Sequence, residues 1–166
     1  MPRKQLTLFI RDNSVIEQLR KRFNPVQFSL IAAHVTLCRE DEIADLEKVK
    51  RNLEKVRLNY PVKMFFDKPL RFEAGKGVLL PVKGDHLQFD ALRGMALQGL
   101  VATPRIYQPH ITLMHPRNST CTDEIFEEIA RHTLPLEFSF DRVSLIEEMA
   151  DGKWITLDSY CLVKGA

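Results

Sequence analysis

HVTL at residues 34–37 and HITL at residues 110–113 decide the fold of this chain. Both tetrapeptides consist of histidine, a branched apolar residue, threonine and leucine, and they begin 76 residues apart. In a β-strand, successive side chains point to opposite faces of the sheet. We therefore expect the histidine and threonine of each motif to stand together on one face, while the two apolar residues anchor the strand in the core.

If the two motif strands lie side by side, His34, Thr36, His110 and Thr112 converge on one site. Such a site suits a phosphodiester. One neutral imidazole can take a proton from an attacking water while the other, protonated, gives a proton to the leaving oxygen; the ordinary histidine pKa of about 6.5 suits both roles. The two hydroxyls can donate to the non-bridging phosphate oxygens. The sequence thus predicts catalysis without a metal ion or any other cofactor.

Helical and strand periodicities alternate outward from the two motifs. The expected strands cover residues 6–10, 28–38, 56–67, 70–82, 106–114, 136–147 and 153–163, and the expected helices cover 13–24, 41–55, 86–100 and 122–132. Pro25 should end the first helix, Thr122 should cap the last one, and Asp151-Gly152 should turn a hairpin. Each half then contains a helix, a strand ending in a histidine motif, a helix and a pair of strands. This order predicts an α+β or mixed α/β fold with an internal duplication.

Composition limits the class of protein. With 166 residues, of which 45% are hydrophobic and 28% charged, the chain is typical of one globular domain over residues 1–166. It has neither an apolar run of about 18 residues nor the apolar core of a signal peptide, so we expect a cytoplasmic protein with no membrane association. The net charge of +2 does not require a nucleic-acid partner. The odd number of widely spaced cysteines, three, predicts free thiols rather than a disulfide framework.

The paired motifs resemble the signature of the 2H phosphoesterase superfamily, the relatives of bacterial 2′-5′ RNA ligase and RNA 2′,3′-cyclic phosphodiesterase. The resemblance extends to AAHVTL at 32–37, YQPHITL at 107–113 and the helix LQFDALRGMALQGL at 87–100. It implies a bilobal α+β fold, in which two pseudo-symmetric lobes with antiparallel sheets flank a central cleft and the helices lie outside. Each lobe would contribute one motif strand to the cleft. The length suits a minimal member, which we expect to be a monomer.

The resemblance also implies an activity. Family members open 2′,3′-cyclic or related cyclic phosphodiesters of RNA ends or nucleotides to 2′-phosphates, and the same chemistry can run as 2′-5′ RNA ligation. Carried over, His34 and His110 are the catalytic pair, with His110 as the base and His34 as the acid, while Thr36 and Thr112 bind the phosphate. The expected partner is accordingly an RNA end or a cyclic nucleotide.

Four further residues are candidates for the rim of the cleft. Arg39 and His115 each follow a motif histidine by five residues, and Arg117 lies close behind. Tyr107, before His110, could stack on a base or pack in the core. The sequence shows no clear pairing of an aromatic residue with an arginine that would hold a base, and it indicates that Trp154 belongs to the core.

Two other functions fit parts of this pattern. The scaffold could serve as a non-catalytic nucleotide- or RNA-binding module, although both motifs are intact. A metal hydrolase could use the histidines as ligands, but no spacing such as HExxH is present and threonine is a poor zinc ligand. Resistance of the activity to EDTA would separate the phosphodiesterase from the metal hydrolase.

Overall fold

The computed structural model describes residues 2–11 and 13–164. Strands and helices alternate along the chain as the mixed periodicity predicts. In order they are β1 (Lys4–Phe9), α1 (Ser14–Phe23), α2 (Pro25–Leu30), β2 (His34–Cys38), α3 (Leu46–Glu54), β3 (Val62–Phe65), β4 (Leu70–Phe72), β5 (Gly77–Pro81), α4 (Leu87–Ala96), β6 (His110–Met114), α5 (Asp123–Ala130), β7 (Glu137–Phe140), β8 (Arg142–Glu148) and β9 (Trp154–Cys161).

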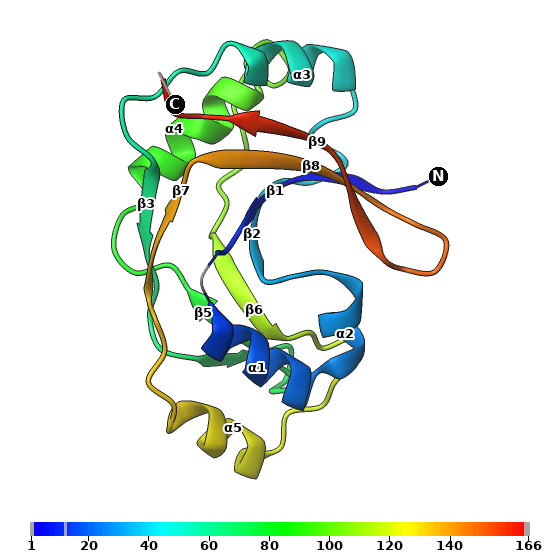
Figure 1. Ribbon diagram of the computed structural model, residues 1–166, viewed down its shortest axis with the longest axis vertical. Coiled ribbons are helices and arrows are strands. Elements are labelled where there is room, and N and C mark those ends of the chain that lie inside the picture. The colour runs from blue at the N-terminus through cyan, green and yellow to red at the C-terminus, as the bar shows by residue number, and fades with distance from the viewer. Residues whose placement is uncertain (1, 12, 165–166) are drawn as a thin grey trace.

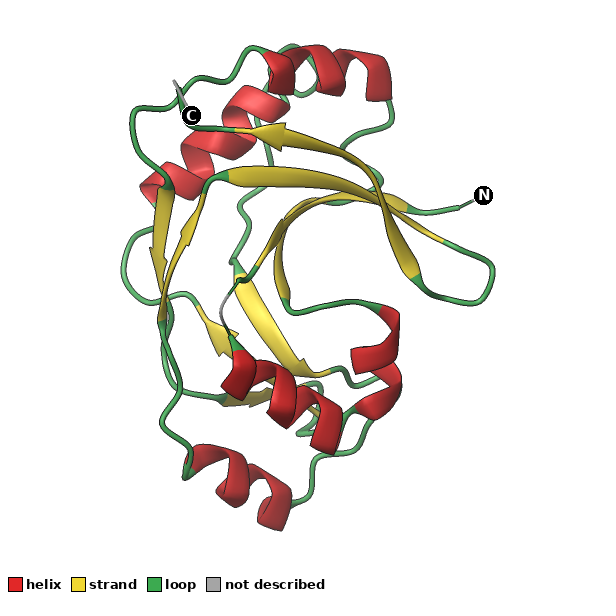
Figure 2. Cartoon of the chain, viewed as in Figure 1, coloured by secondary structure: helices red, strands yellow, loops and turns green. Residues whose placement is uncertain are grey.

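The strands form three antiparallel sheets, ordered β2-β1-β8-β9, β4-β5-β6 and β3-β7. The motif strands β2 and β6 each lie at the edge of a sheet, and these two edges pack against each other. Helices α3 and α4 lie at one end of the molecule, and α1, α2 and α5 at the other, with the strands between them (Figures 1 and 2). The α+β fold expected from the order of strands and helices is confirmed, as is the bilobal form that the family resemblance implies.

The pairing of the motif strands repeats in the two lobes. On β1, Phe9 lies opposite His34 and Thr7 opposite Thr36, and the register then shifts by a bulge. On β5, residues 81 and 79 take the same places opposite His110 and Thr112, and the register shifts at the same point. The burial along β2 and β6 is also identical, with the histidine and threonine half-buried and the two intervening apolar positions buried. The lobes are therefore pseudo-symmetric down to the register of single residues.

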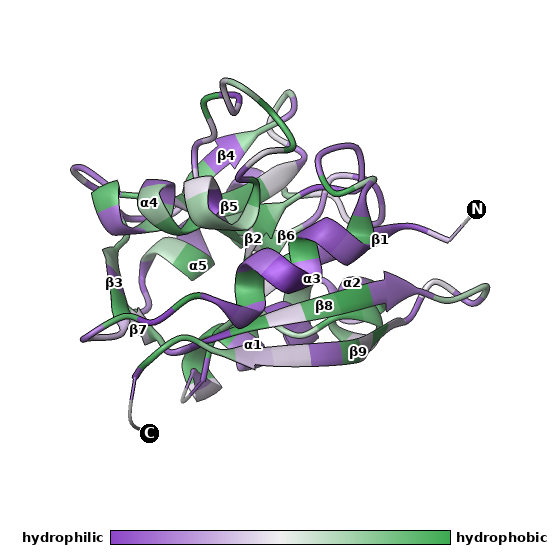
Figure 3. Ribbon diagram, turned by 90° about the horizontal axis from the view of Figure 1, so that it is seen from above, coloured by the Kyte–Doolittle hydropathy of each residue, from purple (hydrophilic) through white to green (hydrophobic). Residues whose placement is uncertain are grey.

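The helices cross between the lobes. Helix α1 connects β1 to β2 but packs against β6, and α4 connects β5 to β6 but packs against β2. Each motif strand is thus covered by a helix from the other half of the sequence. Figure 3 shows the molecule from the end at which α3 lies, and α3 is hydrophilic there. Each lobe of the folded protein consequently contains elements from both halves of the sequence.

The strand expected over residues 28–38 is wrong in its first half, because residues 25–30 form α2. Pro25 ends α1 but also starts α2 at its first position, where the missing N–H costs no hydrogen bond. Strand β2 begins only at His34. The second motif strand likewise begins at His110 rather than at residue 106. Each histidine therefore opens its strand, whereas the pattern of the sequence predicts a position near the strand's end.

Two other expected strands are interrupted. The segment 70–82 is the hairpin β4–β5, turned at residues 73–75, which all have positive φ. The segment 136–147 breaks at Asp141 into β7 and β8, which belong to different sheets. The hairpin at Asp151-Gly152 is confirmed between β8 and β9, and Thr122 caps α5 by accepting a hydrogen bond from the Ile125 amide (3.2 Å).

The apolar residues of the motifs anchor both strands in one core. Val35, Leu37, Ile111 and Leu113 are all buried. We predict that Ile111→Ala lowers the free energy of unfolding by about 2–5 kcal/mol, because it leaves a cavity under the motif strand. Urea unfolding followed by circular dichroism measures the change. Ile106→Ala is the matched control: Ile106 is 91% exposed, so its loss should stay within about 0.5 kcal/mol. Equal effects of the two substitutions would contradict this anchoring role.

Candidate active site

The two motifs meet in one cavity of about 310 Å³ between the lobes. His34 and Thr36 reach it from β2, and His110 and Thr112 reach it from β6. Because both strands begin at their histidine, each ring stands where the chain leaves the connecting loop and enters the sheet. The structure thus brings together the four side chains that the sequence singles out.

Both histidine rings are held in the same way. Nδ1 of His34 lies 2.8 Å from the carbonyl oxygen of Ala32, and Nδ1 of His110 lies 3.0 Å from that of Gln108. A carbonyl oxygen can only accept, so Nδ1–H is the donor in each ring. The neutral ring then carries its lone pair on Nε2, the atom that this contact leaves free to react. Two backbone carbonyls therefore set the same tautomer at both positions.

The surroundings of His34 favour its neutral form. Burial lowers the pKa of His34 to about 4; the hydrogen bond to Ala32 opposes this change, while the charges of Arg20, His110 and His115 add to it. The ring also packs edge-on against Phe9, with 6.2 Å between the ring centroids. At neutral pH His34 is accordingly an unprotonated imidazole, suited to accept a proton.

The two threonines differ in their neighbours. Gln5 Nε2 donates to Thr7 Oγ1 at 2.8 Å and to Thr36 Oγ1 at 3.4 Å. Since the Thr36 oxygen accepts from Gln5, its own hydroxyl hydrogen can point elsewhere and donate. In the second lobe Leu79 takes the place of Thr7 opposite Thr112, and the position equivalent to Gln5 is Gly77, which has no side chain to donate such a hydrogen bond. The pseudo-symmetry of the backbone is therefore broken by side chains inside the cavity.

Tyr107 forms part of the cavity wall, but its ring faces are already occupied. It stacks on Phe89 with 6.0 Å between the centroids, and the guanidinium carbons of Arg93 and Arg39 lie 5.2 and 5.7 Å from its centroid. Burial raises the pKa of the Tyr107 phenol, although Arg39 and Thr36 partly offset this effect. Of the two roles expected for Tyr107, the structure favours packing over stacking on a base.

The other three rim candidates, Arg39, His115 and Arg117, also line the cavity. His115 Nδ1 accepts a hydrogen bond from the Arg117 backbone amide at 3.1 Å. Burial lowers the pKa of His115, and the charges of Arg117 and Arg3 lower it further. Both effects favour the neutral form of His115 beside the cationic Arg117.

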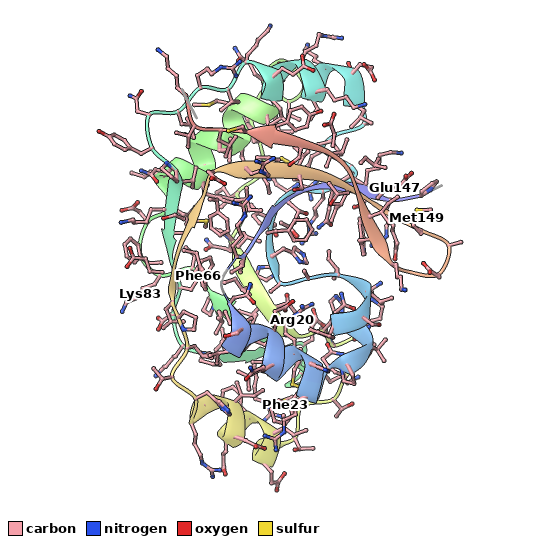
Figure 4. All side chains as sticks on the ribbon, in the orientation of Figure 1. Arg20, Phe23, Phe66, Lys83, Glu147 and Met149 are labelled. Atoms are coloured by element: carbon pink, nitrogen blue, oxygen red, sulfur yellow. The ribbon has the colours of Figure 1, made fainter. Side chains whose placement is uncertain are left out.

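Sequence reasoning missed several residues of the cavity. Arg20 is only 2% exposed and lies on the side of α1 toward the strands (Figure 4), where it donates to the Ile31 carbonyl at 2.7 Å and pairs with Glu17. Trp154, expected in the core, is half-exposed and lines the cavity together with Arg3. No spacing could have revealed the pairing of Arg3 with Trp154, because the two residues lie at opposite ends of the sequence.

The cavity is cationic. Four arginines line it, namely residues 3, 20, 39 and 117, together with the carboxylate of Glu40. Arg3 and Arg20 are paired with Glu148 and Glu17, whereas Arg39 and Arg117 form no salt bridge among the described residues and supply the excess positive charge. A concave surface with this excess of positive charge attracts anions. Within residues 2–11 and 13–164, no group of three or more histidine, cysteine, aspartate or glutamate side chains is arranged to hold a metal ion. The helices of this part of the chain are all too short or too polar to cross a membrane.

A buried ion pair lies behind the cavity. Arg93 Nη2 donates to Glu42 at 2.8 Å and to the Arg105 carbonyl at 3.2 Å, while Nη1 donates to the Leu37 carbonyl at 2.5 Å. Arg93 thereby joins β2 to the loop that leads to β6. Next to it, burial raises the pKa of the Cys38 thiol to about 12, so this thiol stays protonated and is a poor nucleophile.

Comparisons with known proteins agree with this fold. Solved structures with the same fold include E. coli LigT in complex with NADP+ (15% identity, 98% of each chain covered, TM-score 0.64) and in complex with 3′-AMP (16% identity, 99% of this chain and 100% of that chain, TM-score 0.64). TT0787 of Thermus thermophilus is also similar (16% identity, 96% of this chain and 97% of that chain, TM-score 0.61).

At these identities the solved structures establish the fold alone, and no curated protein matches the chain. The family model described as "2'-5' RNA ligase superfamily" matches residues 10–152, a span that includes both histidine motifs. The chain therefore belongs to the 2′-5′ RNA ligase superfamily.

Proposed function

We propose that this protein is a metal-independent phosphodiesterase that opens 2′,3′-cyclic or related cyclic phosphodiesters of RNA ends or nucleotides. The observation that carries this proposal is the pair of imidazoles in one cationic cavity, each fixed by its Nδ1–H to a backbone carbonyl and accompanied by a threonine. The ligands named for the LigT structures, which include 3′-AMP, phosphate and NADP+, all carry phosphate and support it by analogy.

In the proposed reaction, neutral His34 takes a proton from water as the water oxygen attacks phosphorus. The P–O3′ bond breaks, and His110 gives its proton to the departing O3′, which leaves a 2′-phosphate and a 3′-hydroxyl. Thr36 and Thr112 donate to the non-bridging oxygens as negative charge develops on them. A 5′-hydroxyl that attacks in place of water would form a 2′-5′ linkage by the same steps.

These roles are the reverse of those that the family resemblance implies. Burial and the neighbouring positive charges lower the pKa of His34, so its ring is unprotonated at neutral pH and ready to act as the base. A group of this kind is costly to protonate in the free protein and is a weak choice for the acid. We therefore assign the base to His34 and the acid to His110.

The substrate and the absence of a metal requirement can be tested together. We expect the protein to open 2′,3′-cyclic nucleotides or RNA ends to 2′-phosphates, as read by phosphorus NMR, with the same rate in EDTA. A panel with 3′,5′-cyclic and 2′-5′-linked substrates defines the range of the activity. Activity that is lost with EDTA and restored by zinc or manganese would indicate a metal hydrolase, and tight binding without turnover on any substrate would indicate a binding module.

Removing either histidine should abolish most of the turnover. His34→Ala and His110→Ala should each lower kcat by about 10²–10⁴-fold, the usual contribution of an acid–base group. The double variant should lose much less than the product of the two, because the two proton transfers belong to one reaction. His132→Ala, exposed just beyond the end of α5, is the control and should keep the parent kcat. Full turnover by His110→Ala on every substrate would contradict the two-histidine mechanism.

The pH dependence distinguishes the two role assignments. A base whose pKa is lowered stays unprotonated until the pH falls to that value, so kcat/KM should remain high on the acidic side and fall only towards pH 4. The measurement is a kcat/KM profile from about pH 3.5 to 9 in buffers of constant ionic strength, a range that spans both the lowered and the ordinary histidine values. Circular dichroism at each pH ensures that the fold is retained. An acidic limb at the ordinary histidine value of about 6.5 would contradict His34 as the base.

A further inference from the structure

Helix α2 places one uncharged polar side chain in the wall of the cavity. Gln27, in the first turn of α2, is half-buried and lines the same cavity as His34 and His110. The second lobe has no equivalent helix, because α4 is connected to β6 by the irregular segment 97–109. The Gln27 side chain is therefore a feature of one side of the cavity only.

The loop that follows β6 runs beside α2 and contacts Gln27 (Figure 1). In this loop the His115 carbonyl oxygen accepts from the Asn118 backbone amide at 3.2 Å and from the Ser119 hydroxyl at 2.7 Å, and these two bonds close a tight turn. The turn brings the Asn118 side chain to the α1–α2 junction, where it meets both Asn24 and Gln27.

The three amide side chains form a chain of hydrogen bonds whose direction is fixed by the backbone. The His115 backbone amide donates to Asn24 Oδ1 at 2.7 Å, and a backbone N–H can only donate. Asn24 Nδ2 is therefore the donor towards Asn118, and it reaches both Oδ1 at 2.9 Å and the backbone carbonyl oxygen at 3.3 Å. With its Oδ1 accepting, Asn118 donates from Nδ2 to Gln27 Oε1 at 2.8 Å.

The direction of this chain determines what Gln27 presents to the cavity. Its Oε1 is turned to Asn118, which does not line the cavity, and its Nε2 forms no hydrogen bond with another of the residues that the structure describes. Asn24, the first amide of the chain, is only 1% exposed, so water competes little for its contacts. Because the Gln27 oxygen is held, a ligand need not spend much binding energy on ordering the two N–H donors.

We propose that Gln27 is a further substrate-binding residue, which donates from Nε2 to an oxygen atom of the phosphodiester held between the two histidines. Asn24 and Asn118 are positioning residues that act through Gln27. This inference rests on the proposed function, and it adds to the two threonine hydroxyls a donor that carries no charge and does not titrate. Since the second lobe has no counterpart, this donor distinguishes the two sides of a cavity whose backbone is pseudo-symmetric.

NMR of the side-chain amides tests the donor without requiring turnover. In nitrogen–proton correlation spectra, the Gln27 NH₂ signals, identified by their loss in Gln27→Met, should shift when inorganic phosphate or adenosine 2′-monophosphate, a product of the proposed reaction, is added. The NH₂ signals of Gln18, which is exposed on α1 and does not line the cavity, should stay in place. Gln27 signals that move with neither probe would overturn the proposal.

Calorimetry on variants measures how much the donor contributes. Gln27→Met keeps the unbranched shape without the donor, and it should weaken the binding of inorganic phosphate by about 10- to 100-fold, the range for a hydrogen bond to a charged group. Gln27→Glu can still accept from Asn118, but it brings a negative charge to the ligand and should weaken binding further. Gln18→Met and Gln18→Glu are the matched controls and should keep the parent affinity. Unchanged affinity in Gln27→Met would overturn the proposal.

The positioning role of Asn118 has a separate test. Asn118→Ala should weaken the binding of inorganic phosphate by about 2- to 10-fold, because the Gln27 amide is then free to turn. If Asn118 acts through Gln27, the double variant should bind no more weakly than Gln27→Met alone. A loss by the same factor in the presence and absence of Gln27 would show a merely structural effect and would overturn this role.

The failure of this donor and that of the proposed function give different results. If phosphate binding depends on Gln27 but no cyclic phosphodiester is opened, the donor stands and the phosphodiesterase falls. If cyclic phosphodiesters are opened with the same kcat/KM by the parent protein and by Gln27→Met, the phosphodiesterase stands and the donor falls.

Discussion

The structure depends on two edge strands that pack against each other without joining into one sheet. Edge strands normally invite pairing, since their outer N–H and C=O groups are free. Here β2 and β6 belong to separate sheets, and the histidine and threonine side chains occupy the cavity between them. Closing the two edges into a continuous sheet would leave no room for a phosphate between the imidazoles. The site is therefore a gap that the rest of the fold keeps open.

Buried polar contacts hold the two sides of this gap at a fixed distance. Arg93, from α4, reaches the carbonyl of Leu37 on β2 and that of Arg105 before β6, and Glu42 neutralises its charge. Removing one partner of such a buried pair leaves an uncompensated charge, which is strongly destabilising. On the other side, Asn24 accepts from the His115 amide at 2.7 Å and so joins the α1–α2 junction to the end of β6. Neither residue stands out in the sequence, because nothing in its spacing distinguishes it from a surface arginine or asparagine.

The sequence predicts the features that repeat or that depend on neighbouring residues, such as side-chain alternation and helix caps. It does not reveal residue pairs that only the arrangement of distant strands brings together. The alternation within HVTL and HITL correctly places Val35 and Ile111 in the core, and the position of Thr122 just before the helix correctly predicts its role as a cap. The strand over 28–38 failed because an apolar run has no periodicity that separates a strand from a short helix begun by Pro25. Arg3 and Trp154 could not be paired in advance, since only the order of strands in the sheet makes them neighbours.

The crossing of α1 and α4 bears on how a duplicated chain of this kind could arise. One repeat unit runs from β1 to β3 and the other from β5 to β7, and the last strands of the two units, β3 and β7, pair antiparallel, as two-fold symmetry requires. In a single unit on its own, helix α1 or α4 would have no motif strand of the other unit to cover, and strand β3 or β7 would have no strand to pair with. Two copies could satisfy each other only by exchanging helices, as in a domain-swapped dimer. Joining them in one chain converts that concentration-dependent association into an intramolecular one, and it frees the two copies to diverge on either side of a shared cleft.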